Sequence, residues 1–128
     1  MEDEETEFFV ALLLMTLVAN AYLGALPAKR ETIMGEVVDI VSYATKGAHG
    51  EEHSEVIRFR AEGGFPMGIL TEVGTLYVAV YRNPAPAASL EAANKILAPL
   101  AGLQVVCQGR VYERDGVKVV EIAVVSEM

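Results

Sequence analysis

The sequence contains no tryptophan and only one cysteine, Cys107, among 128 residues. A single cysteine cannot form a disulfide within the chain, so a disulfide scaffold is excluded and cysteine pairing gives no information on the redox compartment. The absence of tryptophan removes the commonest stacking and interface side chain. Cys107 follows two valines in a predicted strand, and we expect it to be a buried small apolar residue rather than a reactive thiol.

Basic residues are also scarce. Lysine and arginine number 10 against 18 acidic residues, which gives a formal net charge of -8. Five of the acids lie within the first seven residues, so 13 acids face 10 bases in the rest of the chain. A nearly neutral domain lacks the positive surface that phosphate backbones require, and we expect no nucleic-acid partner.

Catalytic motifs are missing as well. Ser42, Ser54 and Ser89 lie in no G-x-S-x-G sequence, and no Gly-Lys-Ser/Thr follows the glycines at residues 47 to 50. No acid, base or nucleophile is paired in the sequence with an activating partner. We therefore expect a protein that is not an enzyme and that carries no cofactor.

The most informative feature present is an uncharged run over residues 8–26, FFVALLLMTLVANAYLGAL. As a helix it would be about 28 Å long, close to the hydrocarbon thickness of a bilayer. The sequence predicts an acidic tail over residues 1–7, a single transmembrane helix over 8–28 and one small domain over 29–128.

Two alternatives to an anchor remain open, a cleaved signal peptide and a core helix. The triplet at residues 19–21, Ala-Asn-Ala, has the form of a cleavage site, but acids stand where a signal peptide carries bases. A helix packed within the domain would need a polar face, which this run lacks. Lys29 and Arg30 follow the run and weakly favour a cytoplasmic domain.

Side chains of the anchor are candidates for contact with other membrane helices. Thr16 and Asn20 are four residues apart, on one helix face, where polar groups often bond a neighbouring helix. The predicted partner interface comprises Phe8, Phe9, Leu13, Thr16, Asn20 and Tyr22.

Beyond the anchor, the pattern predicts five strands. They cover residues 32–43, 67–71, 75–81, 103–113 and 117–125. A helix capped by Ser54 is expected over 55–62, and one capped by Ser89 is expected before Pro99 and Gly102. Residues 44–54 read as a polar loop.

Five strands with a helix between the third and fourth match the order of an OB-fold barrel. The segments Met34–Val37 and Gln108–Val111 share the pattern x-Gly-charged-Val, in strands that pair in such barrels. A glycine suits the strong curvature required there. We predict a mainly β, five-stranded OB-like barrel with one or two short helices; an SH3-like barrel and an open α+β sheet are the alternatives.

From Gly35 to the end, the chain resembles small exported bacterial OB-like domains of poorly defined function. The matching segments are Gly35–Asp39, Ser42-Tyr43, Gly50-x-x-His53, Gly64–Leu70 and Gly109–Glu113. The resemblance implies a barrel on the exported, periplasmic side of a bacterial inner membrane.

The resemblance also implies cysteines that this chain lacks. Such domains often carry cysteine before the tyrosine and two more after the histidine, at positions that are Ser42, Val56 and Arg60 here. These side chains cannot replace thiolate ligands, so we expect any metal or haem role of similar domains to be lost.

The segment His49-Gly-Glu-Glu-His53 is a weak candidate metal site because two imidazoles and two carboxylates lie close together in it. A solvated loop is the simpler interpretation, since a loop has no regular face to direct the side chains. The aromatic residues are candidates for a stacking platform, although core or partner packing explains them better: Tyr43, Phe59, Phe65, Tyr77, Tyr81 and Tyr112.

These observations favour a non-catalytic, single-pass accessory or assembly subunit of a larger membrane complex. It would act by docking its helix and barrel onto other membrane subunits and the lipid bilayer. An electron-transfer complex, respiratory or photosynthetic, is the specific hypothesis. The alternative is an envelope protein that binds a ligand or metal through the loop at residues 47–54.

Overall fold

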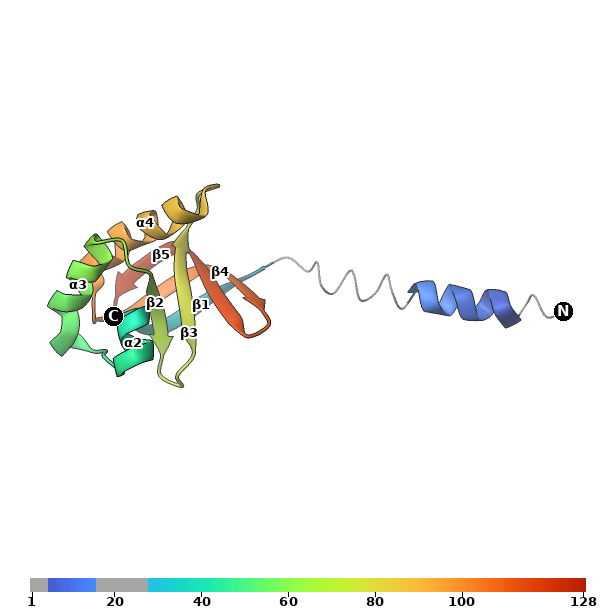
Figure 1. The fold of residues 1–128 in the computed structure, drawn as a ribbon, viewed down its shortest axis with the longest axis horizontal. Helices are drawn as coiled ribbons and strands as arrows, with labels where there is room; N and C mark the ends of the chain where they lie inside the picture. The colour runs from blue at the N-terminus through green and yellow to red at the C-terminus, as the bar shows by residue number, and fades with distance from the viewer. Residues whose placement is uncertain (1–4, 16–27) are drawn as a thin grey trace.

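The computed structural model of the chain describes residues 5–15 and 28–128. Residues 28–128 form a five-stranded closed barrel with three α-helices and two short 3-10 helices (Figure 1). The mainly β, five-stranded fold is thus confirmed, with more helices than the one or two that we expected. The strands are β1 (Lys29–Asp39), β2 (Met67–Thr71), β3 (Leu76–Tyr81), β4 (Gln104–Arg114) and β5 (Val117–Glu127).

The barrel closes through β1, which pairs with two neighbours. Its first part, from Lys29 to Glu36, is antiparallel to β4, and its last part, from Gly35 to Asp39, is antiparallel to β2. The order around the barrel is β1-β2-β3-β5-β4, with β3 parallel to β5. The predicted pairing of the first and fourth strands is confirmed, and closure excludes an open α+β sheet.

Gly35 and Gly109 each lie close to the backbone of a neighbouring strand. Gly35 pairs with both Thr71 and Val105, so β1 changes partner there. A Cβ atom on Gly35 would collide with the carbonyl oxygen of Leu70, and one on Gly109 with that of Glu121. Only glycine lets the backbones approach this closely, a reason for glycine that differs from the curvature expected from the sequence.

The first strand ends earlier than the sequence predicts. We expected it to continue to Tyr43, but α2 (Ile40–Lys46) begins directly after Asp39. The Asp39 side chain accepts a hydrogen bond from the backbone N–H of Val41 at 3.2 Å and so caps the helix. Gly47 ends it at a φ of 69°, which favours glycine. The helix therefore occupies the start of the predicted polar loop.

The other helices fall close to their predicted positions, but neither serine is an N-cap. A 3-10 helix, η1 (Glu51–His53), leads into α3 (Ser54–Glu62), so Ser54 is the first helical residue. Helix α4 (Pro86–Leu97) starts at a proline, whose fixed φ suits a first turn. Ser89 thus lies inside α4 and donates its hydroxyl hydrogen to the carbonyl oxygens of Asn83 and Ala85. A second 3-10 helix, η2 (Ala98–Leu100), follows α4 directly.

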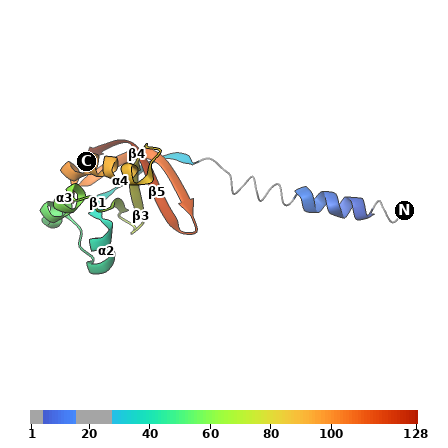
Figure 2. The same ribbon diagram turned by 45° about the horizontal axis from the view of Figure 1, so that its top comes forward.

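The core fills the barrel and the space under α3 and α4. Figures 1 and 2 show α3 on the side of the barrel opposite the tip of the β4–β5 hairpin. Helix α3 contributes Ile57 and Ala61, and α4 contributes Ala93 and Leu97. Ala98 of η2 and Ala101 directly after it also belong to the buried apolar cluster. The strands supply its remaining members, which are Ile33, Val37, Met67, Ile69, Ala79, Val105, Cys107, Val120 and Ile122.

The other described part of the chain is a helix over residues 5–15. Among the described residues, no helix has both the length and the apolar character needed to cross a bilayer. The transmembrane helix predicted over residues 8–28 lies largely outside the described residues, because residues 16–27 are not described.

Candidate functional site

The helix over residues 5–15 carries half of the predicted partner interface. Phe8, Phe9 and Leu13 are all strongly exposed, at 66%, 66% and 62%. The two phenylalanine rings meet edge to face, with centroids 6.1 Å apart. Each residue from 5 to 15 is classed as exposed, and Phe8, Phe9 and Leu13 are among the most exposed large apolar side chains that the structure describes. Thr16, Asn20 and Tyr22, the other predicted interface residues, lie outside the described residues.

A buried carboxylate organises the end of β1. Asp39 is fully buried, and its Oδ2 atom accepts a hydrogen bond from the Ser42 hydroxyl at 2.5 Å. The same oxygen is bonded by Nε of Arg60, which comes from α3. The Arg60 guanidinium also covers the ring of Phe65, 3.9 Å from its centroid. The Asp39 carboxylate therefore joins β1, α2 and α3, and Arg60 extends the cluster to the segment after α3.

Two of the three positions at which the expected resemblance implies cysteine meet in this cluster. Ser42 and Arg60 both bond to Asp39, although they are 18 positions apart in the sequence. Val56, the third position, is 58% exposed on α3 and makes no such contact. The Ser42 hydroxyl and the Arg60 guanidinium therefore both bond to the Asp39 carboxylate, at two of the positions where we expected a cysteine to be replaced.

The loop after α2 folds back onto β1 through His49. Its Nδ1 atom lies 2.6 Å from Oε1 of Glu36, a residue that is only 7% exposed. The His49 ring also meets the Tyr43 ring nearly at a right angle, with centroids 6.0 Å apart. A hollow of about 350 Å³ opens beside this pair, and its lining includes Glu36, Glu51 and Glu127.

The two histidines of the candidate metal loop do not converge. His49 is paired with Glu36, whereas Nε2 of His53 lies 3.7 Å from Glu52. Among residues 5–15 and 28–128, no group of three or more His, Cys, Asp or Glu side chains is arranged to hold a metal ion. The loop is also more ordered than a purely solvated one, because η1 and the Glu36 contact fix it.

The single thiol is inaccessible, as the sequence predicts. Cys107 is 0% exposed in β4 and belongs to the apolar core. Burial raises the pKa of the Cys107 thiol to about 11, so the thiol stays protonated at neutral pH. Cys107 therefore acts as a packing residue, and its thiol is not placed to act as a nucleophile.

The aromatic candidates are distributed over several elements. Phe59 on α3 is 76% exposed, and Phe65 follows the same helix. Tyr77 and Tyr81 lie in β3, and Tyr77 contacts the core. Tyr112 belongs to the β4–β5 hairpin. The rings considered for a stacking platform therefore come from two parts of the molecule, with Phe59 and Phe65 at α3 and Tyr77, Tyr81 and Tyr112 on the strands of the barrel.

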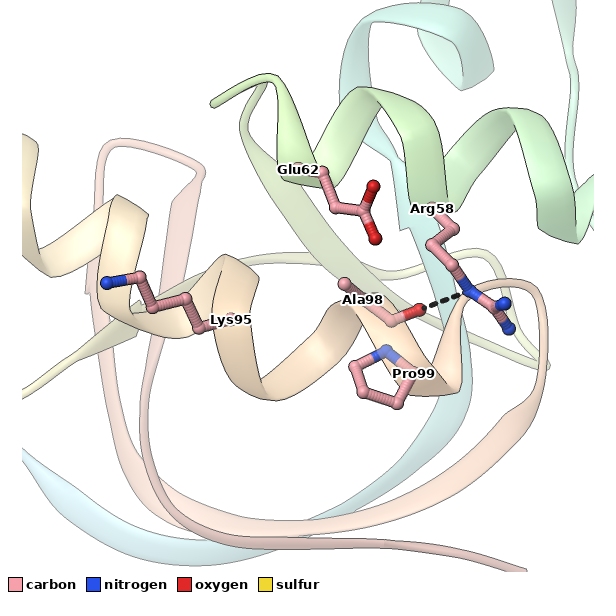
Figure 3. A pocket seen from close by; sticks show the side chains of 5 residues that line it. All are labelled: Arg58, Glu62, Lys95, Ala98 and Pro99. Carbon is pink, nitrogen blue, oxygen red and sulfur yellow. Dashed lines mark hydrogen bonds between the residues drawn. The ribbon is translucent and has the colours of Figure 1, made fainter.

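A larger groove, of about 440 Å³, lies between α3 and the end of α4. Arg58, Glu62 and Lys95 line it together with Ala98 and Pro99, and Nε of Arg58 donates to the Ala98 carbonyl oxygen at 3.3 Å (Figure 3). Figure 3 shows Lys95 directed away from the other two charges. These groups do not converge on a point where a substrate atom would react.

Sequence reasoning missed the pairing of Glu36 with His49 and that of Asp39 with Arg60. Each pair joins residues at least 13 positions apart, so no local spacing signals it. The only local signal in the sequence was Asp39, an acid directly after the apolar pair Val37 and Val38. Comparisons with protein-family models, with curated proteins and with solved structures give no match.

Proposed function

We propose that this chain is a non-catalytic, membrane-anchored subunit in which an OB-like barrel is held at the bilayer by an N-terminal helix. It acts by docking, with the helix against lipid and other membrane helices and the barrel against partner subunits. The strand order β1-β2-β3-β5-β4, with α4 between β3 and β4, supports the OB-like description of the barrel.

The observation that carries the proposal is the exposure of Phe8, Phe9 and Leu13 on one short helix. Burying a side chain of this size contributes about 1.5–3 kcal/mol, so water is a poor environment for all three. The uncharged sequence continues from this helix to Leu26, which gives a segment of the length that hydrocarbon accommodates. Lipid is therefore the covering that fits the segment best.

We place the anchor in a bacterial inner membrane with the barrel on the periplasmic side, on the strength of the resemblance to exported domains. Lys29 and Arg30 directly after the segment favour the opposite side weakly. Protease added to intact spheroplasts tests this placement. Digestion of the barrel supports the periplasmic side, and protection of the barrel until lysis contradicts it.

Membrane retention tests the anchor. We expect the full chain to stay in native membranes through an alkaline carbonate wash, and the variant L13K/L17K to be released. Two charges in an apolar span cost about 5–7 kcal/mol of insertion free energy. The matched control V117K/V124K adds the same charges at barrel positions that are each 60% exposed, and it should be retained. Release of the unmodified chain would overturn the anchor.

Purification in a mild detergent tests docking. We expect other membrane subunits to accompany the chain in fixed ratio, and to be lost from the L13K/L17K variant. Recovery of the chain as a free monomer contradicts the subunit proposal. Stoichiometric zinc or copper in the purified chain would instead favour the alternative function of the loop at residues 47–54.

A further inference from the structure

Three arginines surround a hollow of about 210 Å³ on the barrel. Arg30 comes from the start of β1, Arg110 from β4, and Arg82 directly follows β3. The lining also includes Tyr81 and Glu121, so a single carboxylate faces three guanidinium groups. The hollow spans four neighbouring strands, because β3, β5, β4 and β1 lie side by side in the barrel.

The strand register forces two of these charges together. Arg30 and Arg110 are direct partners in the β1–β4 ladder, and Arg110 is in turn opposite Glu121 of β5. Tyr81 is opposite Ile122 in the parallel β3–β5 pair, which brings the following residue, Arg82, beside the middle of β5. Like charges directly opposite one another destabilise a sheet unless a group of opposite charge lies between them.

Glu121 is the one carboxylate among the residues that line the hollow, too few to balance three arginines. No carboxylate lies within ion-pair distance of Arg30, Arg82 or Arg110 among residues 5–15 and 28–128. Glu121 instead accepts a hydrogen bond from the Tyr112 hydroxyl at 3.3 Å. The hollow therefore keeps two positive charges in excess, with planar donors of the kind that bind phosphate oxygens in pairs.

We propose that this hollow, the Arg30–Arg82–Arg110 pocket, binds a phosphate group and that its ligand is the headgroup of an anionic phospholipid. The choice of lipid over a free phosphate compound rests on the proposed function. Arg30 lies two positions after the predicted membrane span, which ends at residue 28, and so belongs at the level of the headgroups. The pocket would fix the orientation of the barrel on the membrane surface.

The test uses the full chain in an uncharged detergent, titrated with dihexanoyl phosphatidylglycerol or with inorganic phosphate. Nuclear magnetic resonance follows the Nε–Hε signals of the arginines. We expect the signals of Arg30, Arg82 and Arg110 to shift together, and phosphatidylglycerol to bind more tightly than inorganic phosphate. R110Q and R82Q should each weaken binding by about tenfold, as expected for the loss of a charge-assisted hydrogen bond.

The control variant is R114Q, which removes the same charge from the same strand but outside the pocket. It should leave the affinity within about twofold, because exposed charges at a distance contribute little. An equal loss with R114Q, or unshifted signals from the three pocket arginines with both ligands, overturns the phosphate site. Binding of inorganic phosphate without preference for the lipid overturns the lipid as its source. Because both ligands are soluble, the outcome is independent of whether the anchor proposal holds.

Discussion

Arg60 on α3 is bonded to Asp39 at the end of β1, and the carboxylate of Asp39 is fully buried. This ion pair links two elements whose order along the sequence gives no indication that they touch. Removing one partner of a buried pair leaves an uncompensated charge, and this usually costs more than the pair itself contributes.

We therefore expect Arg60→Met to lower the free energy of unfolding by about 3 kcal/mol. The matched variant Arg58→Met, on the same helix, loses only a hydrogen bond to the Ala98 carbonyl and should cost about 1 kcal/mol or less. Urea denaturation of both variants measures the difference. Equal costs would show that the Asp39 carboxylate does not depend on Arg60.

Gly35 and Gly109 should not tolerate even a methyl group. Gly35→Ala and Gly109→Ala each place a Cβ against a carbonyl oxygen of the neighbouring strand, so a strand must move. We expect a loss of about 1–3 kcal/mol for each variant, as is typical of overpacking. Gly63→Ala is the control, since its Cβ would meet no atom closer than 3.5 Å and its φ is -78°. Thermal unfolding compares the three, and a stable Gly109→Ala would contradict the close approach.

The stability of the barrel should fall at high pH because of Cys107. Burial raises the pKa of this thiol from 9.0 to about 11, so the unfolded chain loses the proton at a lower pH than the native chain. The stabilisation is fully present below pH 9 and is lost progressively as the pH rises from about 9 to about 11, by about 2–3 kcal/mol in total.

The difference between the unmodified chain and Cys107→Ala isolates this effect from the titration of lysines and tyrosines. Their free energies of unfolding should run parallel from pH 6 to pH 8 and converge above pH 9. Parallel curves up to pH 11 would mean that the thiol is accessible in the native barrel.

Asn94 fixes α4 to the end of α3. Its Nδ2 atom donates to the carbonyl oxygens of Ala61 and Phe65, at 3.1 and 2.7 Å, and the residue is 3% exposed. We expect Asn94→Ala to cost about 2 kcal/mol, because two buried acceptors lose their donor. Asn94→Asp should cost more, since it removes both donors and adds a charge against two carbonyl groups. Chemical denaturation ranks the variants, and the reverse order would argue against these bonds.

Much of the barrel followed from local pattern. The strands at β2, β3, β4 and β5 were predicted within about two residues, because apolar periodicity and the turn at Asp115 and Gly116 mark them. Helix α2 was missed for a specific reason: Ile40 and Val41 continue a β-branched run, while the cap on Asp39 redirects the backbone. The contacts of the folded domain decided between strand and helix for Ile40 and Val41, and the intrinsic propensity of these residues could not.

The candidate sites were harder to predict because they depend on register. Nothing in the sequence connects Arg30 with Arg110, and only the pairing of β1 with β4 makes them neighbours. The same holds for Glu36 with His49. Motif spacing detects chemistry carried by one segment, whereas here the polar groups come from segments far apart in the chain.

Closure of the barrel by β1 and β4 has a consequence for synthesis of the protein. Gly35 pairs with Val105, so the first strand leaves the ribosome seventy residues before its partner. At about 5–20 residues per second, the outer edge of β1 waits on the order of 4–14 seconds with its backbone hydrogen bonds unmade. A nascent chain of this design benefits from an interaction that shields its leading strand until translation is complete.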